Sequence, residues 1–215
     1  HTPFDPGFDQ LPPAIPIFPL PEAVVLPGVQ LPLNIFEPRY LNMVSDLLGS
    51  HRILGMVQPR SPEDAGTGPV HEVGGAGRIV SFSETEDGRY LVVLRGLCRF
   101  AVGEELDGVR GYRLVRAHWE PFRRDYDPPA PAPVGREELL ARLRRFSESR
   151  GFSVAWDQLE EVGDELLVNL LCANLPLSAD EKQVLLEAPD LAERTRLLTS
   201  LMDAFPAVPG GERRH

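Results

Sequence analysis

Cysteine, histidine and lysine are scarce in this sequence. Its 215 residues include 2 cysteines, 5 histidines and a single lysine, Lys182. Cys98 and Cys172 lie far apart, and neither has the spacing of a metal ligand. We therefore expect no disulfide framework and a reducing, cytoplasmic location. No apolar run approaches the roughly 18 residues that a membrane-spanning helix needs. The N-terminal residues carry no basic region, so a signal peptide is not expected either.

The sequence also lacks familiar catalytic motifs. It contains no G-x-x-x-x-G-K-[ST] for phosphate binding, no H-E-x-x-H for zinc and no G-x-S-x-G around a serine nucleophile. Two of the histidines, His1 and His215, are at the ends of the sequence, and the others are isolated from one another. We expect no metal, no cofactor and no ATP hydrolysis. Convergence of distant histidines in space stays open as an alternative.

Acidic residues outnumber basic ones, 32 to 22, which gives a formal net charge of −10. Such a chain is repelled on average by nucleic-acid phosphates and by anionic membranes. Arginines do cluster at 113–124 and at 136–150, so nucleic-acid binding is the alternative function. Glu137, Glu138 and Glu148 are interspersed with the second cluster, however. This mixture is more typical of a solvated helix face with local ion pairs.

The most apolar segment, IPIFPLPEAVVLPGVQLPLNIFEPRY at residues 15–40, is interrupted by prolines. We predict short strands over 15–20 and 29–36. Because proline lacks an amide proton, it occurs in strands mainly at edges, ends or bulges, so these strands should be bent and lie at the rim of a barrel. Glu37-Pro38 predicts the start of a helix, and apolar residues at helical spacing continue it to Gly49.

A second β-rich stretch spans residues 73–102. Asp87-Gly88 separates two strand-like runs within it, which is a strong hairpin signal. Gly74, Gly75 and Gly77 predict a bulge or a close backbone approach. Residues 111–122 should complete the sheet.

Beyond the proline-rich stretch 125–135, the spacing of apolar residues becomes helical, and Pro189 is expected to open the last helix. The fold class predicted is α+β, a β-barrel followed by a helical bundle. The predicted parts are a flexible segment at 1–14, the barrel at 15–124, a linker at 125–135, helices at 136–205 and a flexible tail at 206–215.

Ser178 and Lys182 raise the alternative of a Ser–Lys hydrolase. Ser178 and Glu181, however, form the capping-box pattern at the start of the helix predicted over SADEKQVLLEA. No neighbouring pattern supplies an oxyanion hole or a pocket that would lower the pKa of the lysine. We expect no catalysis from this pair, and only a slight loss of stability when Lys182 is replaced.

Large apolar side chains gather in the opening segment: Phe18, Leu20, Val25, Leu26, Phe36 and Tyr40. A small barrel cannot easily bury all of them. Each one singly is best explained by core packing. Together they predict an apolar groove, and exposed apolar grooves commonly contact peptides or proteins.

The same segment resembles the opening of the amino-terminal domain of the Lon ATP-dependent protease family. FPL…LPG…LPL…IFEPRY is its most specific element. ILGMVQP, VGGAGRIVSFSETEDGRYLVVLRGLCRFAV and NLLCANLPLSADEKQVLLEAPDLAERTRLL resemble later blocks of that domain in the same order. The resemblance covers most of residues 15–202. It implies a PUA-like barrel followed by helices.

The resemblance also implies that the domain recognises and holds substrate proteins. Lon proteases continue into an ATPase motor and a Ser–Lys peptidase domain, and this sequence contains neither. We therefore expect a non-enzymatic module, either a stand-alone protein or a fragment, that binds unfolded or apolar polypeptides. It would act as an adaptor, with a Lon-type protease as a further partner. The candidate contact residues are Phe18, Phe36, Glu37, Pro38, Arg39 and Tyr40. Phe36 and Tyr40 would supply apolar area.

Overall fold

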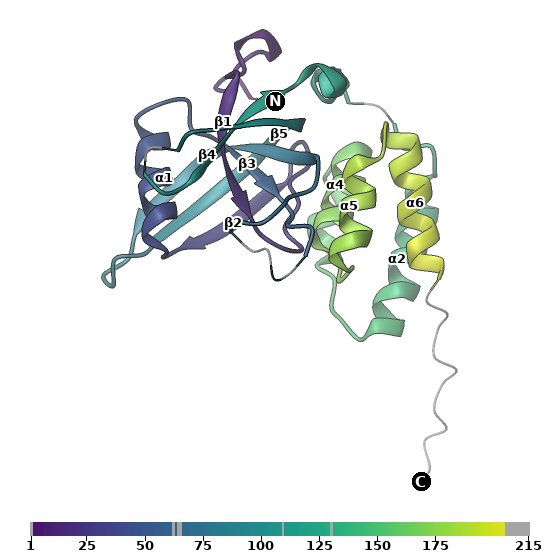
Figure 1. Ribbon diagram of the computed structural model, residues 1–215. Coiled ribbons are helices and arrows are strands. Elements are labelled where there is room, and N and C mark those ends of the chain that lie inside the picture. Colours follow the sequence, from purple (N-terminus) through teal and green to yellow (C-terminus); the bar gives the residue numbers. More distant parts are fainter. Residues whose placement is uncertain (1, 62, 64–65, 109, 130, 205–215) are drawn as a thin grey trace. The chain divides into compact units, whose positions relative to one another are not determined.

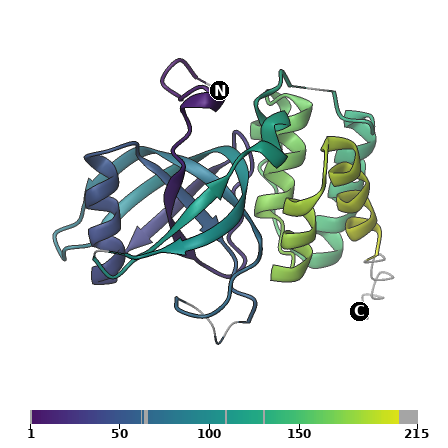
Figure 2. The ribbon, with the colours of Figure 1, turned by 45° about the horizontal axis from the view of Figure 1, so that its top comes forward.

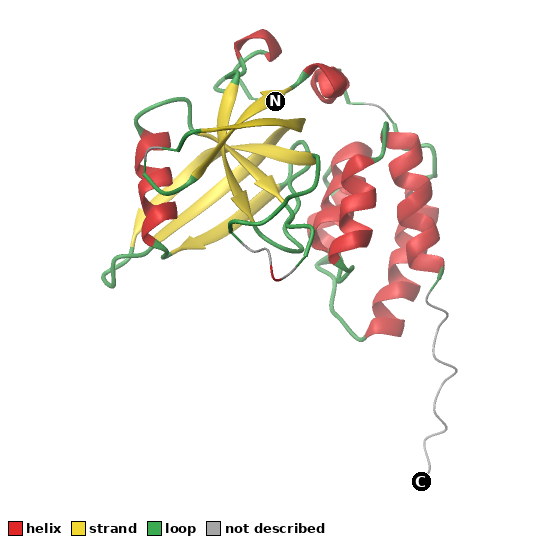
Figure 3. Ribbon diagram, in the orientation of Figure 1, coloured by secondary structure: helices red, strands yellow, loops and turns green. Residues whose placement is uncertain are grey.

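The computed structural model describes residues 2–61, 63, 66–108, 110–129 and 131–204 (Figure 1). The predicted α+β class is confirmed, because strands fill the first part of the chain and helices the second, with one helix between strands (Figure 3). The strands are β1 (Ala14–Pro19), β2 (Gln30–Ile35), β3 (Ile53–Val57), β4 (Val73–Glu84), β5 (Tyr90–Leu106) and β6 (Arg113–His118). The helices are α1 (Pro38–Leu48), α2 (Arg136–Arg150), α3 (Trp156–Glu160), α4 (Asp164–Asn174), α5 (Ala179–Glu187) and α6 (Leu191–Asp203), with 3₁₀ helices η1 (Phe8–Gln10) and η3 (Glu120–Tyr126).

The strands form a closed barrel. The sheet order is β2-β5-β4-β3-β1-β6, and β6 pairs again with β5. Closure depends on the length of β5, whose first half pairs with β2 through Tyr90–Arg95 and whose last residues, from Ala101 to Leu106, pair with β6. β2 therefore lies outside the ring as an edge strand. Figure 2 shows the strands wrapping around one another, with α1 at one end of the barrel.

The proline in β2 sits where the sheet needs no amide donor. Gly96 N donates to Val29 O over 2.8 Å. Hydrogen-bonded and non-hydrogen-bonded positions alternate along an antiparallel pair. Pro32, opposite Val93, is at a non-hydrogen-bonded position, so its backbone nitrogen points away from β5. The predicted edge position is correct for this strand, and Pro32 also weakens the free edge as a template for further pairing.

Pro16, the first of the two prolines in β1, has a different environment, because β1 pairs on both sides. Pro16 lies opposite Leu114 of β6, and pairing with β3 begins only at Ile17, opposite Gly55. Pro16, which lacks an amide proton, therefore lies just before the residues of β1 that pair with β3. The prediction that both strands lie at a rim is wrong for β1, which is internal to the barrel.

Residues 23–29 cross the barrel between β1 and β2, and their backbone lies directly on two strands. A Cβ atom at Gly75 would lie 1.8 Å from Val25 O, and one at Gly96 would lie 2.0 Å from Leu26 O. The close backbone approach predicted for the glycines of β4 is thus confirmed. Val25 and Leu26 are buried, at 1% and 0% exposure, which corrects their expected place in an exposed groove.

The described part of the predicted flexible segment, residues 2–14, is anchored to the barrel. Asp5 is 1% exposed and pairs with Arg78 Nε at 3.1 Å and with Arg95 Nη2 at 2.5 Å. Burial alone would raise the pKa of Asp5, but hydrogen bonds from Thr2 N and from the arginines lower it overall. Trp119 Nε1 donates to Pro12 O at 2.8 Å. The ion pairs of Asp5 join it to arginines far along the chain, which no local sequence pattern could indicate. They hold a segment that was expected to be flexible.

A buried glutamine attaches α5 to the strands. Gln58 is 1% exposed, and its Nε2 donates to Ala179 O at 2.9 Å and to Gln183 Oε1 at 3.0 Å. Its Oε1 accepts from Glu22 N at 2.8 Å. Gln183 Nε2 donates in turn to Val73 O at 3.0 Å. Because each buried polar atom of Gln58 has a partner, the network fixes the position of α5 without an unsatisfied group.

The contacts divide the chain into two compact units. The barrel unit comprises His1–Pro128 and Asn169–Glu187, and the helical unit comprises Pro129–Val168 and Ala188–His215. In the helical unit α2 and α6 pack together and bury apolar residues of both, Leu139, Leu143, Phe146, Leu198 and Met202. One division falls inside the predicted linker, 125–135. The predicted domain boundaries themselves stay a prediction, and the predicted tail, 206–215, lies outside the described residues.

Several local predictions can be compared directly with the structure. Ser178 N donates to Glu181 Oε2 at 2.7 Å and Glu181 N donates to Ser178 Oγ at 3.3 Å, which confirms the capping box. Pro189 does not open the last helix. Asp190 is its N-cap and accepts from Glu193 N at 2.9 Å. Residues 120–122 belong to η3 instead of the sheet. None of the described helices combines the length and apolar character needed to span a membrane.

Substitution of Gly75 by alanine should destabilise the barrel strongly. The new Cβ would meet the carbonyl of Val25, which is backbone and cannot rotate away. We expect the free energy of unfolding in urea to fall by about 3 kcal/mol or more. Gly49→Ala is the control, because a Cβ there meets only ordinary contacts of 3.7 Å or more. Equal stability of the two variants would contradict the close approach.

Candidate functional site

Five of the six predicted contact residues, Phe36 to Tyr40, lie where β2 passes into α1, and the sixth, Phe18, lies in β1. The predicted helix start is confirmed, since Pro38 occupies the first helical turn after Glu37, whose φ of −71° and ψ of 134° are extended. α1 buries one face, with Tyr40, Met43, Val44 and Leu47, against the barrel. The residues of this junction therefore differ in exposure: Tyr40, in the helix, is buried, whereas Phe36, just after the strand, is exposed.

Four of the predicted residues form a stack. The rings of Phe18 and Tyr40 lie 4.2 Å apart between centroids, and the Arg39 guanidinium lies 4.7 Å from the Tyr40 centroid. Arg39 Nη2 pairs with Glu37 Oε2 at 2.9 Å. A Cβ at Gly66 would lie 2.5 Å from Arg39 Nη2, so the guanidinium rests against that loop. The stack orders the start of α1 and closes this end of the barrel.

Tyr40 cannot present its ring to a ligand. It is 4% exposed, and burial raises the pKa of its hydroxyl, with Arg39 acting in the opposite direction. Phe18 is partly buried beneath it. The expectation that Tyr40 supplies contact area is therefore wrong, because its ring packs between β1 and Arg39. Phe36, in contrast, is 64% exposed.

Phe36 belongs to an exposed apolar surface on the barrel. Leu33 and Ile35 are buried, so side-chain alternation places Pro32 and Phe36 on the outer side of β2. Asn34 lies opposite Leu91 of β5, which is 45% exposed. Phe36 follows Ile35, the last residue of β2 that pairs with β5. We call Pro32, Phe36 and Leu91 the outer apolar face.

Sequence reasoning identified Phe36 but missed Leu91. The run LVVL at 91–94 is apolar throughout and predicts a strand covered on both sides. Val92 and Leu94 are buried, whereas Leu91 is exposed near the start of the strand. Side-chain alternation along β5 explains this difference, because Leu91 points to the opposite side of the strand from Val92.

The outer apolar face offers contact area instead of reactive groups. Within the residues described here, no cluster of three or more His, Cys, Asp or Glu could hold a metal ion. The Ser–Lys alternative is also weak. Lys182 Nζ donates to Glu22 O at 3.1 Å and to Ala173 O at 2.9 Å, and the Ser178 hydroxyl bonds with Glu181. Both side chains are therefore engaged in structural contacts.

Comparison with known proteins gives a consistent result. The family model for the ATP-dependent protease La (LON) substrate-binding domain matches residues 14–204. Lon protease 2 of Sorangium cellulosum (strain So ce56) is 32% identical over 213 residues, which cover 94% of this chain and 25% of that protein. The Lon protease of Anaeromyxobacter dehalogenans (strain 2CP-C) is 27% identical over 91% of this chain and 24% of its own length. The chain spans about a quarter of these relatives.

Solved structures show the same fold. The crystal structure of a Lon N-terminal domain protein from Xanthomonas campestris is similar with a TM-score of 0.62 at 24% identity, covering 90% of this chain and 99% of that one. The N-terminal domain of the Mycobacterium avium complex Lon protease gives a TM-score of 0.63 at 19% identity, covering 88% and 98%. The matched region is the substrate-binding domain, not the ATPase or the peptidase.

Serine substitutions at Tyr40 and Phe36 should have different effects on stability. Tyr40→Ser removes a buried ring and its stacking with Phe18, so the free energy of unfolding should fall by about 3–4 kcal/mol. Phe36→Ser removes an exposed ring and should change it by less than about 0.5 kcal/mol. Urea unfolding followed by circular dichroism measures both. A larger loss at Phe36 than at Tyr40 would contradict the assignment of the exposed face.

Replacement of Lys182 by methionine should cost about 2 kcal/mol, because the backbone carbonyls of Glu22 and Ala173 lose a charged donor. This exceeds the slight loss expected from sequence, since the side chain is 8% exposed. Burial lowers the pKa of Lys182, with Glu22 opposing. The unfolded chain then binds more protons between the lowered pKa and the ordinary value of 10.5, so the contribution of Lys182 should increase as pH rises through that window. A pH-independent stability difference between the chain and the variant would contradict this.

Proposed function

This chain belongs to the LON substrate-binding domain family, and on that premise we propose that it is a non-catalytic module that binds unfolded or apolar polypeptide segments through the outer apolar face. The observation that carries the proposal is the exposure of Phe36 and Leu91 on a barrel whose other large side chains are mostly buried. An exposed aromatic ring and an exposed aliphatic side chain each remove apolar area from water when a partner covers them.

The architecture around the face supports capture of flexible chains. Leu33 and Ile35 point into the core, so β2 holds Phe36 from a rigid strand. Pro32 leaves the free edge of β2 without a donor at its centre. Such an edge favours contact of a partner with the side chains of β2 over addition of further strands to the sheet. The face can then hold an apolar segment without promoting aggregation of the module itself.

A second part of the proposal concerns partners. The relatives named above are Lon proteases, so we propose a Lon-type protease as the partner to which bound polypeptides are passed. In this role the module is an ATP-independent adaptor in the cytoplasm. It contributes recognition, and the ATPase and peptidase of the partner contribute unfolding and cleavage.

The nucleic-acid alternative has less support. Several arginines of the predicted basic strip pair with carboxylates: Arg113 with Glu105 at 2.8 Å, Arg123 with Glu120 at 3.0 Å, and Arg142 with Glu138 at 2.8 Å. Paired guanidinium groups have less charge to offer phosphates. The net charge of −10 acts in the same direction.

Binding of a permanently unfolded model protein tests the proposal. We expect micromolar affinity, on the order of 8 kcal/mol, that changes little with added salt because the contact is apolar. Phe36→Ser and Leu91→Ser should each weaken it about tenfold. Val184→Ser is the matched control, since Val184 is 50% exposed but lies on α5. The proposal fails if all three variants bind alike with the fold intact by circular dichroism, or if the unaltered chain does not bind.

A further inference from the structure

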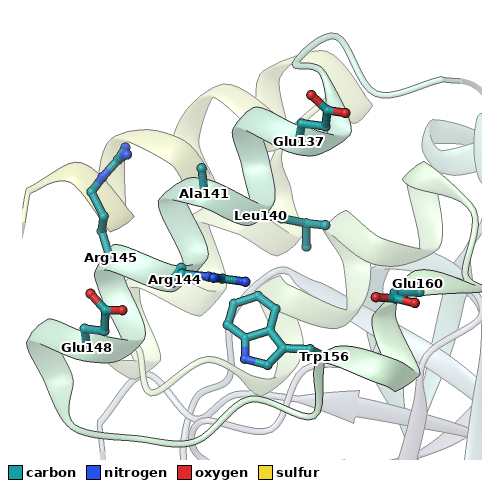
Figure 4. A pocket seen from close by; sticks show the side chains of 8 residues that line it. All are labelled: Glu137, Leu140, Ala141, Arg144, Arg145, Glu148, Trp156 and Glu160. Carbon is teal, nitrogen blue, oxygen red and sulfur yellow. The ribbon is translucent and has the colours of Figure 1, made fainter.

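A groove on the helical unit is separate from the outer apolar face. It lies between α2 and α3 and has a volume of about 440 Å³. Leu140, Ala141 and Trp156 form its apolar part (Figure 4). All of its lining residues belong to the helical unit, so its shape depends on that unit alone. A partly exposed tryptophan in a concave site is the kind of residue that anchors protein contacts.

Arg144 and Trp156 form the centre of the groove. The Arg144 guanidinium lies 5.0 Å from the centroid of the Trp156 ring, and Figure 4 shows it over the ring beside Leu140. Its charge is therefore already stabilised by the ring. Stacking also holds both side chains in place, so an incoming side chain meets a preformed surface.

Carboxylates surround this centre. Glu137 and Glu148 come from α2 and Glu160 from α3, where Asp157 is a further exposed acid. In the ranges that the structure describes, no ion pair involves any of these four side chains. Neighbouring acids differ: Glu138 pairs with Arg142 at 2.8 Å, and Asp164 pairs with Arg136 at 3.0 Å. The rim thus carries carboxylates outside any ion pair, and two exposed arginines of α2, Arg144 and Arg145, line the same groove.

From this arrangement we propose that the α2–α3 groove binds a polypeptide segment that carries apolar residues next to lysine or arginine. The apolar side chain packs on Leu140 and Trp156, and the flanking cations pair with Glu148 and Glu160. The net charge of −10 attracts such segments over a longer range. This inference rests on the proposed polypeptide-binding function and adds a second surface with its own selectivity.

Charge reversal in the groove tests this inference. The probes are a short peptide of leucine and lysine in equal numbers and its counterpart with glutamate in place of each lysine. We expect the intact chain to prefer the lysine peptide. Glu148→Lys/Glu160→Lys should weaken that peptide at least about tenfold and reverse the preference. Glu84→Lys/Glu86→Lys changes the net charge equally on exposed barrel residues and should have an effect below about threefold. Fluorescence anisotropy of labelled peptides measures these affinities.

Two further readouts keep the outcome independent of folding defects. Arg145→Glu should strengthen binding of the lysine peptide, which unfolding cannot do. In a Trp119→Phe background, Trp156 is the remaining tryptophan, and its fluorescence should change when the lysine peptide binds. Absence of that change, equal losses in the two double variants, or preference of the intact chain for the glutamate peptide would overturn the inference. So would a dimer, seen by sedimentation, that only the groove variant disrupts, because a second copy would then be the occupant.

The two surfaces can be distinguished in the same series. Phe36→Ser should leave binding of the lysine peptide to the groove unchanged within about twofold. If the groove variants have no effect while Phe36→Ser still weakens capture of the unfolded protein, the groove inference fails and the proposed function stands. If Phe36→Ser has no effect on either ligand while charge reversal does, the outer apolar face fails instead.

Discussion

The contact of one backbone segment with two glycines determines much of the barrel unit. Val25 and Leu26 can cross β4 and β5 only because Gly75 and Gly96 have no side chains. The crossing buries three consecutive apolar residues, Val24–Leu26. It also places Glu22 in a left-handed conformation, with φ of 62°, where its N–H reaches Gln58 and its carbonyl reaches Lys182. The attachment of α5 therefore depends on the same close approach.

The register of β2 follows from this crossing as well. Gly28 N donates to Gly96 O at 3.0 Å at the point where the segment turns into the strand. A shift of one residue would move Leu33 and Ile35 to solvent and turn Phe36 inward. The exposure of Phe36 is thus a consequence of a turn several residues earlier. Recognition of polypeptides through the outer apolar face would thus depend on the backbone contact of Gly28 with Gly96, which lies outside that face.

Local signals predicted the elements well, and long-range contacts account for most of the differences. The Asp87-Gly88 hairpin, the capping box at Ser178 and the helix start at Pro38 each depend on residues a few positions apart. The burial of Tyr40 in α1 depends instead on Phe18, which lies in β1. The anchoring of Asp5 by Arg78 and Arg95 spans 73 and 90 residues.

The candidate site was predictable to a similar extent. The proline-rich pattern indicated an unusual edge strand, and Phe36 was included in the predicted set. Whether a given apolar side chain faces solvent depended on its tertiary surroundings: Tyr40 of α1 packs on Phe18 of β1, whereas Phe36 and Leu91 stay exposed. The α2–α3 groove was not predicted, because Arg144 and Trp156 come from different helices and meet only after α2 turns back at Gly151, with φ of 72°.

The interleaving of the two units imposes an order on synthesis. β6 ends at His118, but α5, which supplies partners to Gln58 and Val73, ends at Glu187. At roughly 5–20 residues per second, a ribosome needs several seconds to make the intervening chain. During that interval the nascent barrel has its strands but not the helix that satisfies its buried amide. Residues 129–168 emerge before the barrel unit is complete. The order of emergence therefore differs from the order of the units, and the barrel spends its first seconds as an incomplete fold beside the ribosome.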